Sequence, residues 1–308
     1  MKTLLRIFVV LLVLALGAGA IFYLHPLWVN DQMMYLRLWR GGIQSKYVDL
    51  PTGRVHYDEV AAAAGTAGTP LLLIHGLGAR AEDWANLMPG LAANGFHVYA
   101  PDLLGYGRSA RPSVHYSVAF EESVVLQFMQ AMHLERADVG GWSMGGWIVL
   151  RFALDHPERV DRLVVYDSAG IYFVPGFGVD LFTPTDVAGL DRLQQKLTPH
   201  PQKLPEFVVH DAVRRLEKNA PVVGPALADM MTGRDVLDGQ LGGLKPPLLI
   251  VWGAEDQLIP VAVAEKMHEL TPGSQLELVP SCGHLAASQC PEPVLEDTVR
   301  FLRDAQPR

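Results

Sequence analysis

The sequence of 308 residues lacks the patterns that indicate binding of nucleic acid, metal or nucleotide. Its 25 lysines and arginines against 33 aspartates and glutamates give a formal net charge of -8, with the two signs interspersed. A phosphate backbone requires a basic surface, so nucleic acid is not an expected partner. No group of His, Cys, Asp and Glu has metal-ligand spacing, and no phosphate-binding or dinucleotide fingerprint follows a strand-like run. We therefore expect neither a metal nor any other cofactor.

Cysteine is also scarce, because the chain has only Cys282 and Cys290, eight positions apart. In an exported protein these two could form a disulfide, whereas in the cytosol they would stay free as packing residues. The sequence leaves both possibilities open.

Charge is absent from residues 7–24, which are almost entirely apolar. A helix of this length, at about 1.5 Å per residue, reaches roughly 27 Å, close to the roughly 30 Å hydrocarbon core of a bilayer. We expect an uncleaved membrane anchor, because Trp28, Tyr35 and Trp39 follow as a plausible interfacial belt. A cleaved signal peptide is the alternative, since residues 17–20 (GAGA) offer a cleavage position.

Basic residues stand on both sides of this run, with Lys2 and Arg6 before it and Arg37, Arg40 and Lys46 after it. The positive-inside rule therefore does not fix its orientation. The order of charge, apolar run and small residues is typical of export. We expect the folded body to lie outside the cytoplasm, as an anchored periplasmic domain or, after cleavage, as a secreted protein.

The body of the chain alternates short apolar runs with longer helix-like segments. Extended runs at 46–50 and 54–59 flank a turn and predict a hairpin, and the small residues 61–69 predict an exposed loop. Buried or extended strands are predicted at 71–74, 97–100, 137–139, 163–166, 248–252 and 275–279. Helices are predicted at 81–94, 117–133, 145–156, 261–270 and 291–304. The alternation predicts an α/β fold with a doubly wound, mostly parallel sheet.

Residues 171–244 interrupt this alternation, with no clear strand, recurrent prolines and glycines, and scattered phenylalanines and methionines. An insertion of about 70 residues is too long for an ordinary loop and is typical of a lid or binding element. The predicted organisation is an N-terminal anchor or signal segment with its connector at 1–45, a core at 46–170, a helical cap at 171–244 and the second part of the core at 245–308.

The stretch GGWSMGGW places Ser143 directly after a predicted strand and directly before a predicted helix. Gly141 and Gly145 stand two positions to either side and let the turn approach the sheet. This is the G-x-S-x-G pattern of a nucleophile elbow in the strand–turn–helix context that it requires. Each glycine costs about 0.5–1 kcal/mol inside regular structure, so a purely structural turn has little reason to hold four.

Two backbone N–H groups are candidates for an oxyanion hole. Met144 follows the serine at the start of the predicted helix, where unpaired amides and the helix dipole favour negative charge. Leu77 lies in HGLG, directly after the first central strand. We assign one donor to each residue.

A serine hydroxyl needs a base to accept its proton, and that base needs a carboxylate to orient it. His284 lies late in the chain, in a glycine-containing loop after an extended run, whereas His75 is the main rival and precedes the serine. Asp256, in the loop after the strand at 248–252, is the expected acid. Asp167, at the end of the preceding strand, and Glu255 are the alternatives.

Five motifs in this order, LLLIHGLGA, HVYAPDLLGYGRS, GWSMGG, LLIVWGAEDQLIP and CGHL, resemble the α/β-hydrolase family over about residues 46–303. More narrowly, they are similar to its membrane-anchored bacterial lipases and esterases and its monoacylglycerol-lipase-like branch. The resemblance implies the nucleophile, acid, base and two oxyanion donors as Ser143, Asp256, His284, Leu77 and Met144. Trp142 departs from the commonest pattern, in which a histidine precedes the nucleophile, and is expected to form a wall of the pocket.

These residues predict a serine carboxylic-ester hydrolase that acts at a membrane on apolar acyl esters such as short- or medium-chain glycerides. Trp142 and the cap residues Phe173 and Phe177 are the expected substrate contacts. A thioesterase, a carbon–carbon bond hydrolase or a perhydrolase could use the same three catalytic residues. A ligand-binding protein of the same fold without catalysis is the alternative from another class. Serine at 143 disfavours relatives that use an aspartate nucleophile.

Overall fold

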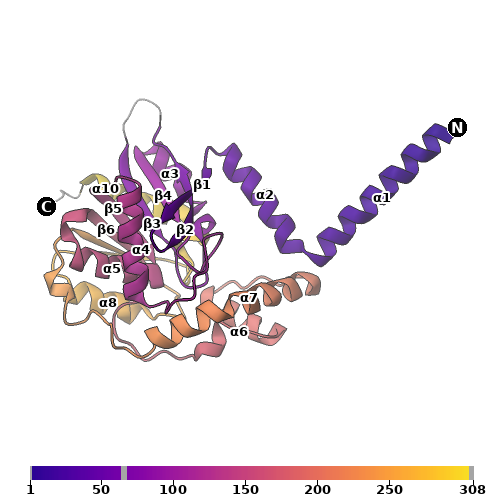
Figure 1. Cartoon of the computed structure of the whole chain (residues 1–308). Helices are drawn as coiled ribbons and strands as arrows, with labels where there is room; N and C mark the ends of the chain where they lie inside the picture. The colour runs from indigo at the N-terminus through magenta and orange to yellow at the C-terminus, as the bar shows by residue number, and fades with distance from the viewer. Residues whose placement is uncertain (1, 64–67, 305–308) are drawn as a thin grey trace.

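An eight-stranded sheet with helices on both faces forms the body of the protein in the computed structural model, which describes residues 2–63 and 68–304 (Figure 1). The strand order is β1-β2-β4-β3-β5-β6-β7-β8. The first three strands in this order pair antiparallel, and β4 through β8 pair parallel. The strands are β1 (Gln44–Leu50), β2 (Gly53–Val60), β3 (Thr69–Ile74), β4 (Phe96–Pro101), β5 (Ala137–Trp142), β6 (Val160–Tyr166), β7 (Leu248–Gly253) and β8 (Gln275–Val279).

Ten α-helices and four short 3₁₀ turns connect and cover these strands in the described residues. The α-helices are α1 (Lys2–Leu24), α2 (Pro26–Arg40), α3 (Met88–Ala93), α4 (Val118–Ala131), α5 (Met144–Asp155), α6 (Val187–Leu197), α7 (Glu206–Met230), α8 (Val261–Leu270), α9 (Ala286–Gln289) and α10 (Pro291–Asp304). The 3₁₀ turns are η1 (Ala81–Trp84), η2 (Pro157–Arg159), η3 (Val179–Leu181) and η4 (Leu241–Gly243).

The predicted α/β class with a doubly wound, mostly parallel sheet is confirmed. The prediction of one helix at 81–94 is wrong, because the segment divides into η1 and α3. Pro89 lies in the first turn of α3, where its fixed φ and missing N–H are tolerated, so the helix begins there. The strand predicted at 137–139 continues to Trp142, because β3 and β6 pair with its glycines on both sides. Of the loop predicted at 61–69, residues 64–67 lie outside the described residues, and Thr69 already belongs to β3.

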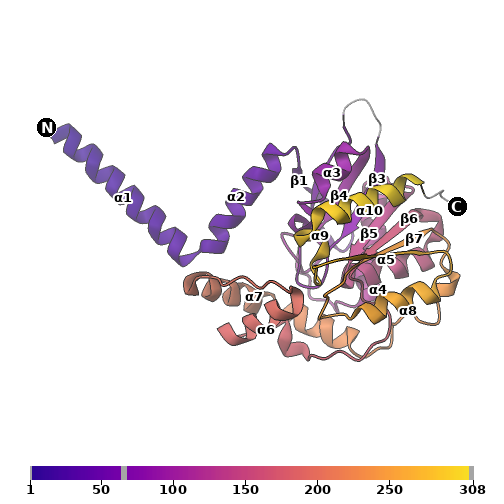
Figure 2. The ribbon, with the colours of Figure 1, turned by 180° about the vertical axis from the view of Figure 1, so that it is seen from behind.

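Two apolar layers hold the helices against the sheet, one on each face. In β3, Leu72 and Ile74 face the layer that contains α4, α5 and α8, while Leu71 and Leu73 face the layer that contains α3 and α10. Figures 1 and 2 show these two helical layers from opposite sides. Because both faces of the central strands are buried, their sequences are continuous apolar runs rather than alternating ones. Each fully buried side chain contributes roughly 1.5–3 kcal/mol to folding.

The chain between β6 and β7 forms η3, α6, α7 and η4, with no strand in this described segment. Leu193 of α6 and Val223 of α7 line the same cavity as Ser143, which directly follows β5. The helices α6 and α7 therefore lie over the carboxyl end of β5. Trp147 of α5 fixes the far end of this segment, because its indole N–H donates to the Asp235 carbonyl at 3.0 Å.

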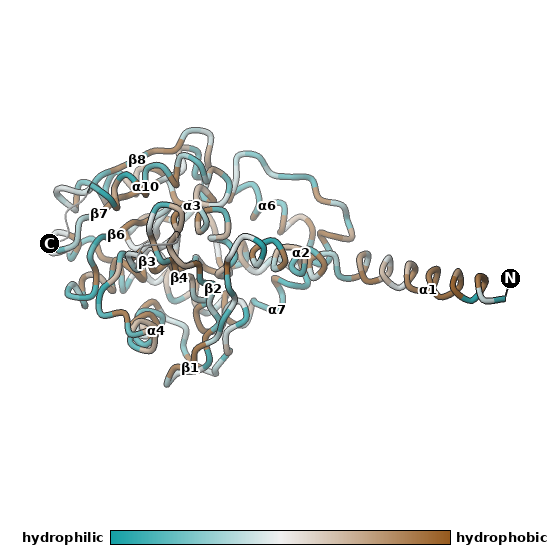
Figure 3. Tube along the Cα trace, turned by 90° about the horizontal axis from the view of Figure 1, so that it is seen from above, coloured by the Kyte–Doolittle hydropathy of each residue, from teal (hydrophilic) through white to brown (hydrophobic). Residues whose placement is uncertain are grey.

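Helix α1 projects away from the body and is long and apolar enough to cross a membrane (Figure 3). It spans 23 residues with a mean hydropathy of 2.8 over its most apolar window, and none of its residues is buried. Helix α1 is therefore a candidate membrane span by its length and composition. The ring of Phe207, near the start of α7, lies 5.7 Å from the ring of Phe22 and 5.3 Å from that of Tyr23. The end of α1 therefore contacts the segment that covers the sheet.

Helix α2 attaches both to this segment and to the loop after β3 through the buried carboxylate of Asp31. One oxygen of Asp31 accepts from Arg80 at 2.7 Å, and the other accepts from Arg215 of α7 at 2.8 Å. Burial alone would raise the pKa of Asp31, but the two guanidinium groups hold it below its usual value. A second bond joins the Leu27 N–H to Asp211 of α7 at 2.9 Å.

We expect Asp31→Ala to release α2 from the body, because it leaves two partly exposed guanidinium groups without their shared carboxylate, at a cost of about 1–3 kcal/mol. Hydrogen exchange of the α2 amides should accelerate in the detergent-solubilised full-length protein. Asp49→Ala is the matched control, since the Asp49 side chain is 89% exposed and lies 4.0 Å from Arg54. Unchanged protection of α2 in Asp31→Ala would show that the cluster does not hold the helix.

Candidate active site

The turn between β5 and α5 holds Ser143 in a conformation that non-glycine residues rarely adopt. Its φ is 55° and its ψ is -118°, a strain of the order of 1–3 kcal/mol. The surrounding backbone maintains it: the Ser143 N–H donates to the Tyr166 carbonyl at 3.0 Å, and the Ser143 carbonyl accepts from Ala169 at 3.0 Å. The backbone of the neighbouring strand β6 and the loop after it therefore fix the position of the serine hydroxyl.

Gly141 and Gly145 provide the space for this turn. A Cβ on Gly141 would collide with the backbone carbonyl of Gly145, and a Cβ on Gly145 would collide with the carbonyls of Ile74 and His75. All of these neighbours are backbone atoms of the sheet or the turn, which have no rotamer through which to move away. The two glycines are therefore needed for α5 to pack this closely against β3 and β5.

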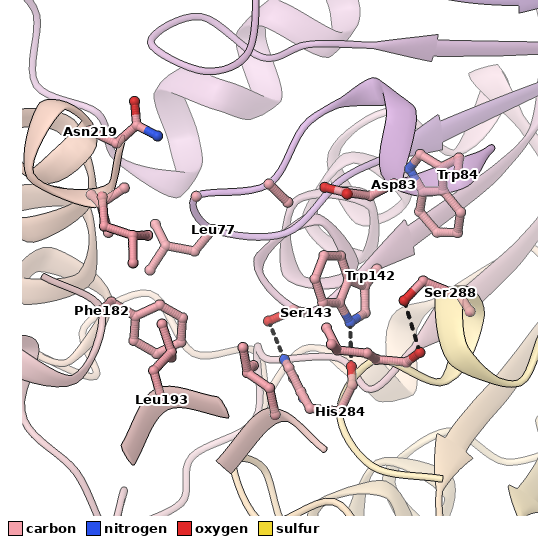
Figure 4. A pocket seen from close by; sticks show the side chains of 17 residues that line it. Leu77, Asp83, Trp84, Trp142, Ser143, Phe182, Leu193, Asn219, His284 and Ser288 are labelled. Carbon is pink, nitrogen blue, oxygen red and sulfur yellow. Dashed lines mark hydrogen bonds between the residues drawn. The ribbon is translucent and has the colours of Figure 1, made fainter. Parts of the chain in front are cut away.

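Ser143, His284 and Asp256 form one hydrogen-bonded line, brought together from three distant parts of the chain (Figure 4). Nε2 of His284 lies 2.9 Å from Oγ of Ser143, and Nδ1 lies 2.8 Å from Oδ2 of Asp256. The other oxygen of Asp256 accepts from the N–H groups of Leu258 at 2.8 Å and Ile259 at 2.9 Å. The carboxylate is thereby fixed at both oxygens, which orients the imidazole toward the serine.

The environment of His284 favours its protonated form. Burial by itself would lower the pKa of this histidine, which is only 1% exposed. The charge of Asp256, its hydrogen bond and the more distant charge of Asp167 outweigh burial and raise the pKa above the ordinary 6.5. An imidazole in this setting can accept a proton from Ser143 and be stabilised as a cation by Asp256.

Asp167 and Glu255, the two alternatives for the acid, take other positions. Asp167 accepts from the N–H groups of Gly253 at 2.7 Å and Ala286 at 3.3 Å, and burial together with the nearby Asp256 raises its pKa to about 7. Glu255 is exposed to solvent. Neither carboxylate has a hydrogen bond to the imidazole of His284 in the described part of the chain. Asp167 instead supports the loops that carry the acid and the base.

His75 has a structural position beneath the loop that contains Leu77. Its Nδ1 donates to the Gly76 carbonyl at 2.8 Å, and its Nε2 accepts from the Leu103 N–H at 3.0 Å, which defines a neutral tautomer. Burial lowers the pKa of His75, consistent with that neutral form. A neighbouring buried carboxylate, Asp102, accepts hydrogen bonds from the backbone N–H groups of Ala81 at 2.7 Å and Arg108 at 2.8 Å. His75 and Asp102 thus hold adjacent loops in place.

The two candidate oxyanion donors lie at the site. Met144 is the first residue of α5, so its N–H has no partner within the helix. Leu77 lines the same cavities as Ser143. The loop approaches closely, because a Cβ built on Gly76 would lie 3.1 Å from the Cβ of Ser143. The backbone of residues 76–77 therefore has the proximity that an oxyanion hole requires.

Two apolar cavities meet at Ser143, and both also include Leu77 and Phe182 in their walls. One, which we call the His284 cavity, contains His284, Trp142, Asp83, Trp84, Leu193 and Ser288. The other, which we call the Phe173 cavity, contains Phe173, Phe177, Trp147, Met230, Leu258 and Ile259. The three residues predicted as substrate contacts therefore line different cavities, with Trp142 in one and both phenylalanines in the other.

Several contacts of the site carry no signal in the sequence. The indole N–H of Trp142 donates to the backbone carbonyl of His284 at 2.7 Å, so it fixes the loop of the base as well as lining the cavity. Asp83 and Trp84 enter the wall from η1, which sequence periodicity alone assigned to one longer helix. Only the three-dimensional approach of these loops reveals these contacts.

Cys282 and Cys290 form a disulfide across the segment that contains His284 and α9. The sequence left free cysteines and a disulfide as open possibilities. In the structure the two cysteines are bonded to each other. Among the residues that the structure describes, no group of three or more His, Cys, Asp and Glu could hold a metal ion.

The strained serine turn, the sheet topology and the hydrogen-bonded Ser–His–Asp line define the class of the α/β-hydrolases. A family model described as alpha/beta hydrolase fold matches residues 69–289, and the chain belongs to this family.

Relatives of known sequence include 2-hydroxymuconate semialdehyde hydrolase of Pseudomonas sp. (strain CF600), 32% identical over 235 residues that cover 71% of this chain and 81% of that protein. An uncharacterized protein of Mycobacterium tuberculosis is 29% identical over 276 residues, 82% of this chain and 81% of its own. Among solved structures, a membrane phospholipase A described as a bacterial virulence factor superposes with a TM-score of 0.82 at 25% identity, covering 99% of this chain and 100% of that one.

We expect Gly145→Ala to destabilise the protein by at least about 3 kcal/mol, because the new methyl group would overlap backbone carbonyls that cannot yield. Thermal unfolding of the detergent-solubilised full-length protein measures the loss. Gly239→Ala is the control, since a Cβ at that position meets nothing within 4 Å. Equal melting temperatures for the two variants would contradict the packing argument.

Proposed function

We propose that this α/β-hydrolase is a serine carboxylic-ester hydrolase that cleaves esters of apolar acyl groups at a membrane. The observation that carries the proposal is the Ser143–His284–Asp256 line at the junction of two apolar cavities. Apolar walls with a few convergent polar groups are typical of sites for small apolar ligands. The line supplies a nucleophile, a base and an orienting carboxylate in the order that acyl transfer needs.

The proposed reaction proceeds through an acyl-enzyme. Oγ of Ser143 attacks the ester carbonyl while its proton passes to Nε2 of His284, and the resulting oxyanion accepts from the N–H groups of Leu77 and Met144. The imidazolium then donates that proton to the departing alcohol oxygen as the carbon–oxygen bond breaks. Water, deprotonated by His284, attacks the acyl-enzyme in the same manner and releases the acid and the free serine.

The proposed location is the outer side of a cytoplasmic membrane. Helix α1 has the length and hydropathy of a membrane span, and the likeness to a membrane phospholipase A extends over 99% of the chain. The disulfide favours an oxidising compartment outside the cytoplasm. The contacts of Phe207 with Phe22 and Tyr23 favour an anchor that is retained, because signal cleavage after residue 20 would leave these rings at a free chain end. In this proposal residues 1–45 anchor the enzyme and residues 171–244 form its cap.

A carbon–carbon bond hydrolase is the second candidate, supported by the 32% identity to 2-hydroxymuconate semialdehyde hydrolase. A substrate of that type carries a carboxylate, which a binding site ordinarily matches with Arg or Lys. Neither cavity contains an Arg or Lys among the described residues of its wall, and the His284 cavity contains Asp83. These walls favour a neutral ester over an anionic dienoate.

Ser143→Ala should reduce kcat/KM for nitrophenyl butyrate by about 10⁴–10⁶-fold while leaving the circular dichroism spectrum and melting temperature intact. The variant removes only the nucleophilic oxygen. Ser123→Ala, on α4 and outside both cavities, is the control and should retain full activity. Undiminished turnover by folded Ser143→Ala would refute the proposed mechanism.

The pH profile should show an acid limb whose midpoint lies above 6.5, because the active form needs neutral His284 and its pKa is raised. Below that pKa the imidazole is protonated and kcat/KM falls as the pH falls. Asp256→Asn removes the charge that opposes the effect of burial, so the same limb should move to lower pH while the maximal rate decreases. A wild-type midpoint below 6.5, or a limb that stays in place in Asp256→Asn, would contradict this assignment.

A further inference from the structure

Helix α2 presents an apolar face that the described residues leave uncovered. Trp28, Met33, Leu36 and Trp39 are 53%, 52%, 45% and 69% exposed. The spacing of Trp28, Leu36 and Trp39 places these three on one side of the helix. Large apolar side chains gathered on one exposed face mark a site of association. We call this surface the tryptophan face and ask which partner it fits.

The other side of α2 is bound to the body of the protein. Asp31 accepts from Arg80 and Arg215, and the guanidinium carbon of Arg108 lies 4.5 Å from the ring centroid of Tyr35. Tyr35, which the sequence groups with the two tryptophans as an interfacial belt, therefore belongs to the inner side of the helix. With one face on protein and an apolar face turned outward, α2 has the pattern of an amphipathic helix at an interface.

The segment that precedes α2 in the chain identifies the partner. Only His25 separates α2 from α1, the candidate membrane span. The His25 N–H donates to the Ile21 carbonyl at 2.9 Å, and the His25 carbonyl accepts from the Val29 N–H at 3.1 Å, so hydrogen bonds hold the joint on both sides. Pro26 has no N–H to continue the ladder of α1, which accounts for the bend. A helix that begins one residue after a membrane span begins at the bilayer surface.

The position and the charge of α2 both suit a lipid surface. Figures 1 and 2 show α2 between α1 and the sheet, so with α1 across the bilayer α2 lies on the membrane side of the body. Tryptophan is enriched where the hydrocarbon core meets the headgroups. Besides Asp31, the charged residues of α2 are Arg37 and Arg40, and both are exposed. The outward charge of the helix is therefore positive, which favours anionic headgroups.

We propose that α2 lies flat in the headgroup layer of the bilayer, with the tryptophan face in the lipid and the catalytic body on its other side. The residues that hold α2 adjoin the site: Arg80 and Arg215 are the sequence neighbours of Ala79 and Leu216, which line the His284 cavity. The lipid contact of α2 therefore sets the position of this cavity relative to the membrane. This consequence for turnover rests on the proposed ester hydrolysis, whereas the placement of α2 does not.

Quenching of tryptophan fluorescence by brominated lipid tests the placement, with the full-length protein in vesicles of phosphatidylcholine and phosphatidylglycerol. The contribution of each tryptophan is the quenching that disappears in Trp28→Phe or in Trp39→Phe. The two contributions should be similar, and bromine near the headgroup should quench more strongly than bromine near the chain end. If α2 instead pointed away from the bilayer, Trp39 would lie about 16 Å further from the lipid than Trp28, at about 1.5 Å per residue, and only Trp28 would be quenched.

A second measurement tests whether this contact positions the site. Leu36→Asp places a charge on the tryptophan face and leaves the inner side of α2 intact. It should lower kcat/KM for nitrophenyl palmitate carried in the vesicles by about threefold or more, while turnover of dissolved nitrophenyl butyrate stays at the wild-type level. Leu278→Asp is the matched control, because Leu278 is 43% exposed and lies on β8, at the opposite edge of the sheet from β1. It should change neither rate.

The outcomes separate the placement of α2 from the function of the enzyme. Quenching of Trp28 alone would overturn the placement, and so would protection of both tryptophans, the result expected if a second copy of the chain covered this face. Equal loss of both rates in Leu36→Asp, or loss of neither, would overturn the positioning role. A wild-type protein that hydrolyses neither nitrophenyl ester while both tryptophans are quenched would overturn the proposed function and leave the placement of α2 standing.

Discussion

The strained turn at Ser143 is the constraint on which the rest of the site depends. A non-glycine residue with a φ of 55° is held between β5 and α5 by bonds to the Tyr166 carbonyl and the Ala169 N–H. The helix can follow so directly only because Gly141 and Gly145 carry no side chain where the backbone passes. Favourable packing of the sheet around the turn offsets this backbone strain. As a result, the hydroxyl projects to a position that the carboxylate in the loop after β7 and the imidazole in the loop after β8 both approach.

The sheet order explains why residues so distant in sequence meet. Strands β5, β6 and β7 are neighbours and parallel, so their carboxyl ends lie along one edge. Ser143 follows β5 and Asp256 comes from the loop after β7, while His284 follows β8 one strand further along. Ligand sites in open α/β sheets form at this edge. The segment between β6 and β7, with α6 and α7, lies over this edge and completes the walls of two cavities.

Much of this arrangement could be predicted from the sequence, because it depends on local patterns. Buried parallel strands are apolar runs, and the elbow has a fixed glycine spacing, so the strand–turn–helix context of Ser143 and the candidates His284 and Asp256 could be proposed without coordinates. What could not be predicted depends on long-range approach. The extension of β5 through its glycines comes from pairing with its neighbours, and the bond from Trp142 to the His284 carbonyl joins residues 142 positions apart.

The N-terminal helices are integrated with the body rather than attached by a loose tether. Asp31 joins Arg80, near the loop that contains Leu77, to Arg215 of the segment that covers the site. Helix α2, helix α7 and the loop that contains Leu77 therefore share one partly buried ionic cluster.

The central claim is that Ser143 is a nucleophile activated by His284. Reaction of the full-length protein with a fluorophosphonate, followed by peptide mass spectrometry, tests it most directly. The account predicts a single adduct on Ser143 that forms far more slowly in folded His284→Ala. A folded wild-type protein that stays unmodified at Ser143, or is labelled on another serine, would contradict it.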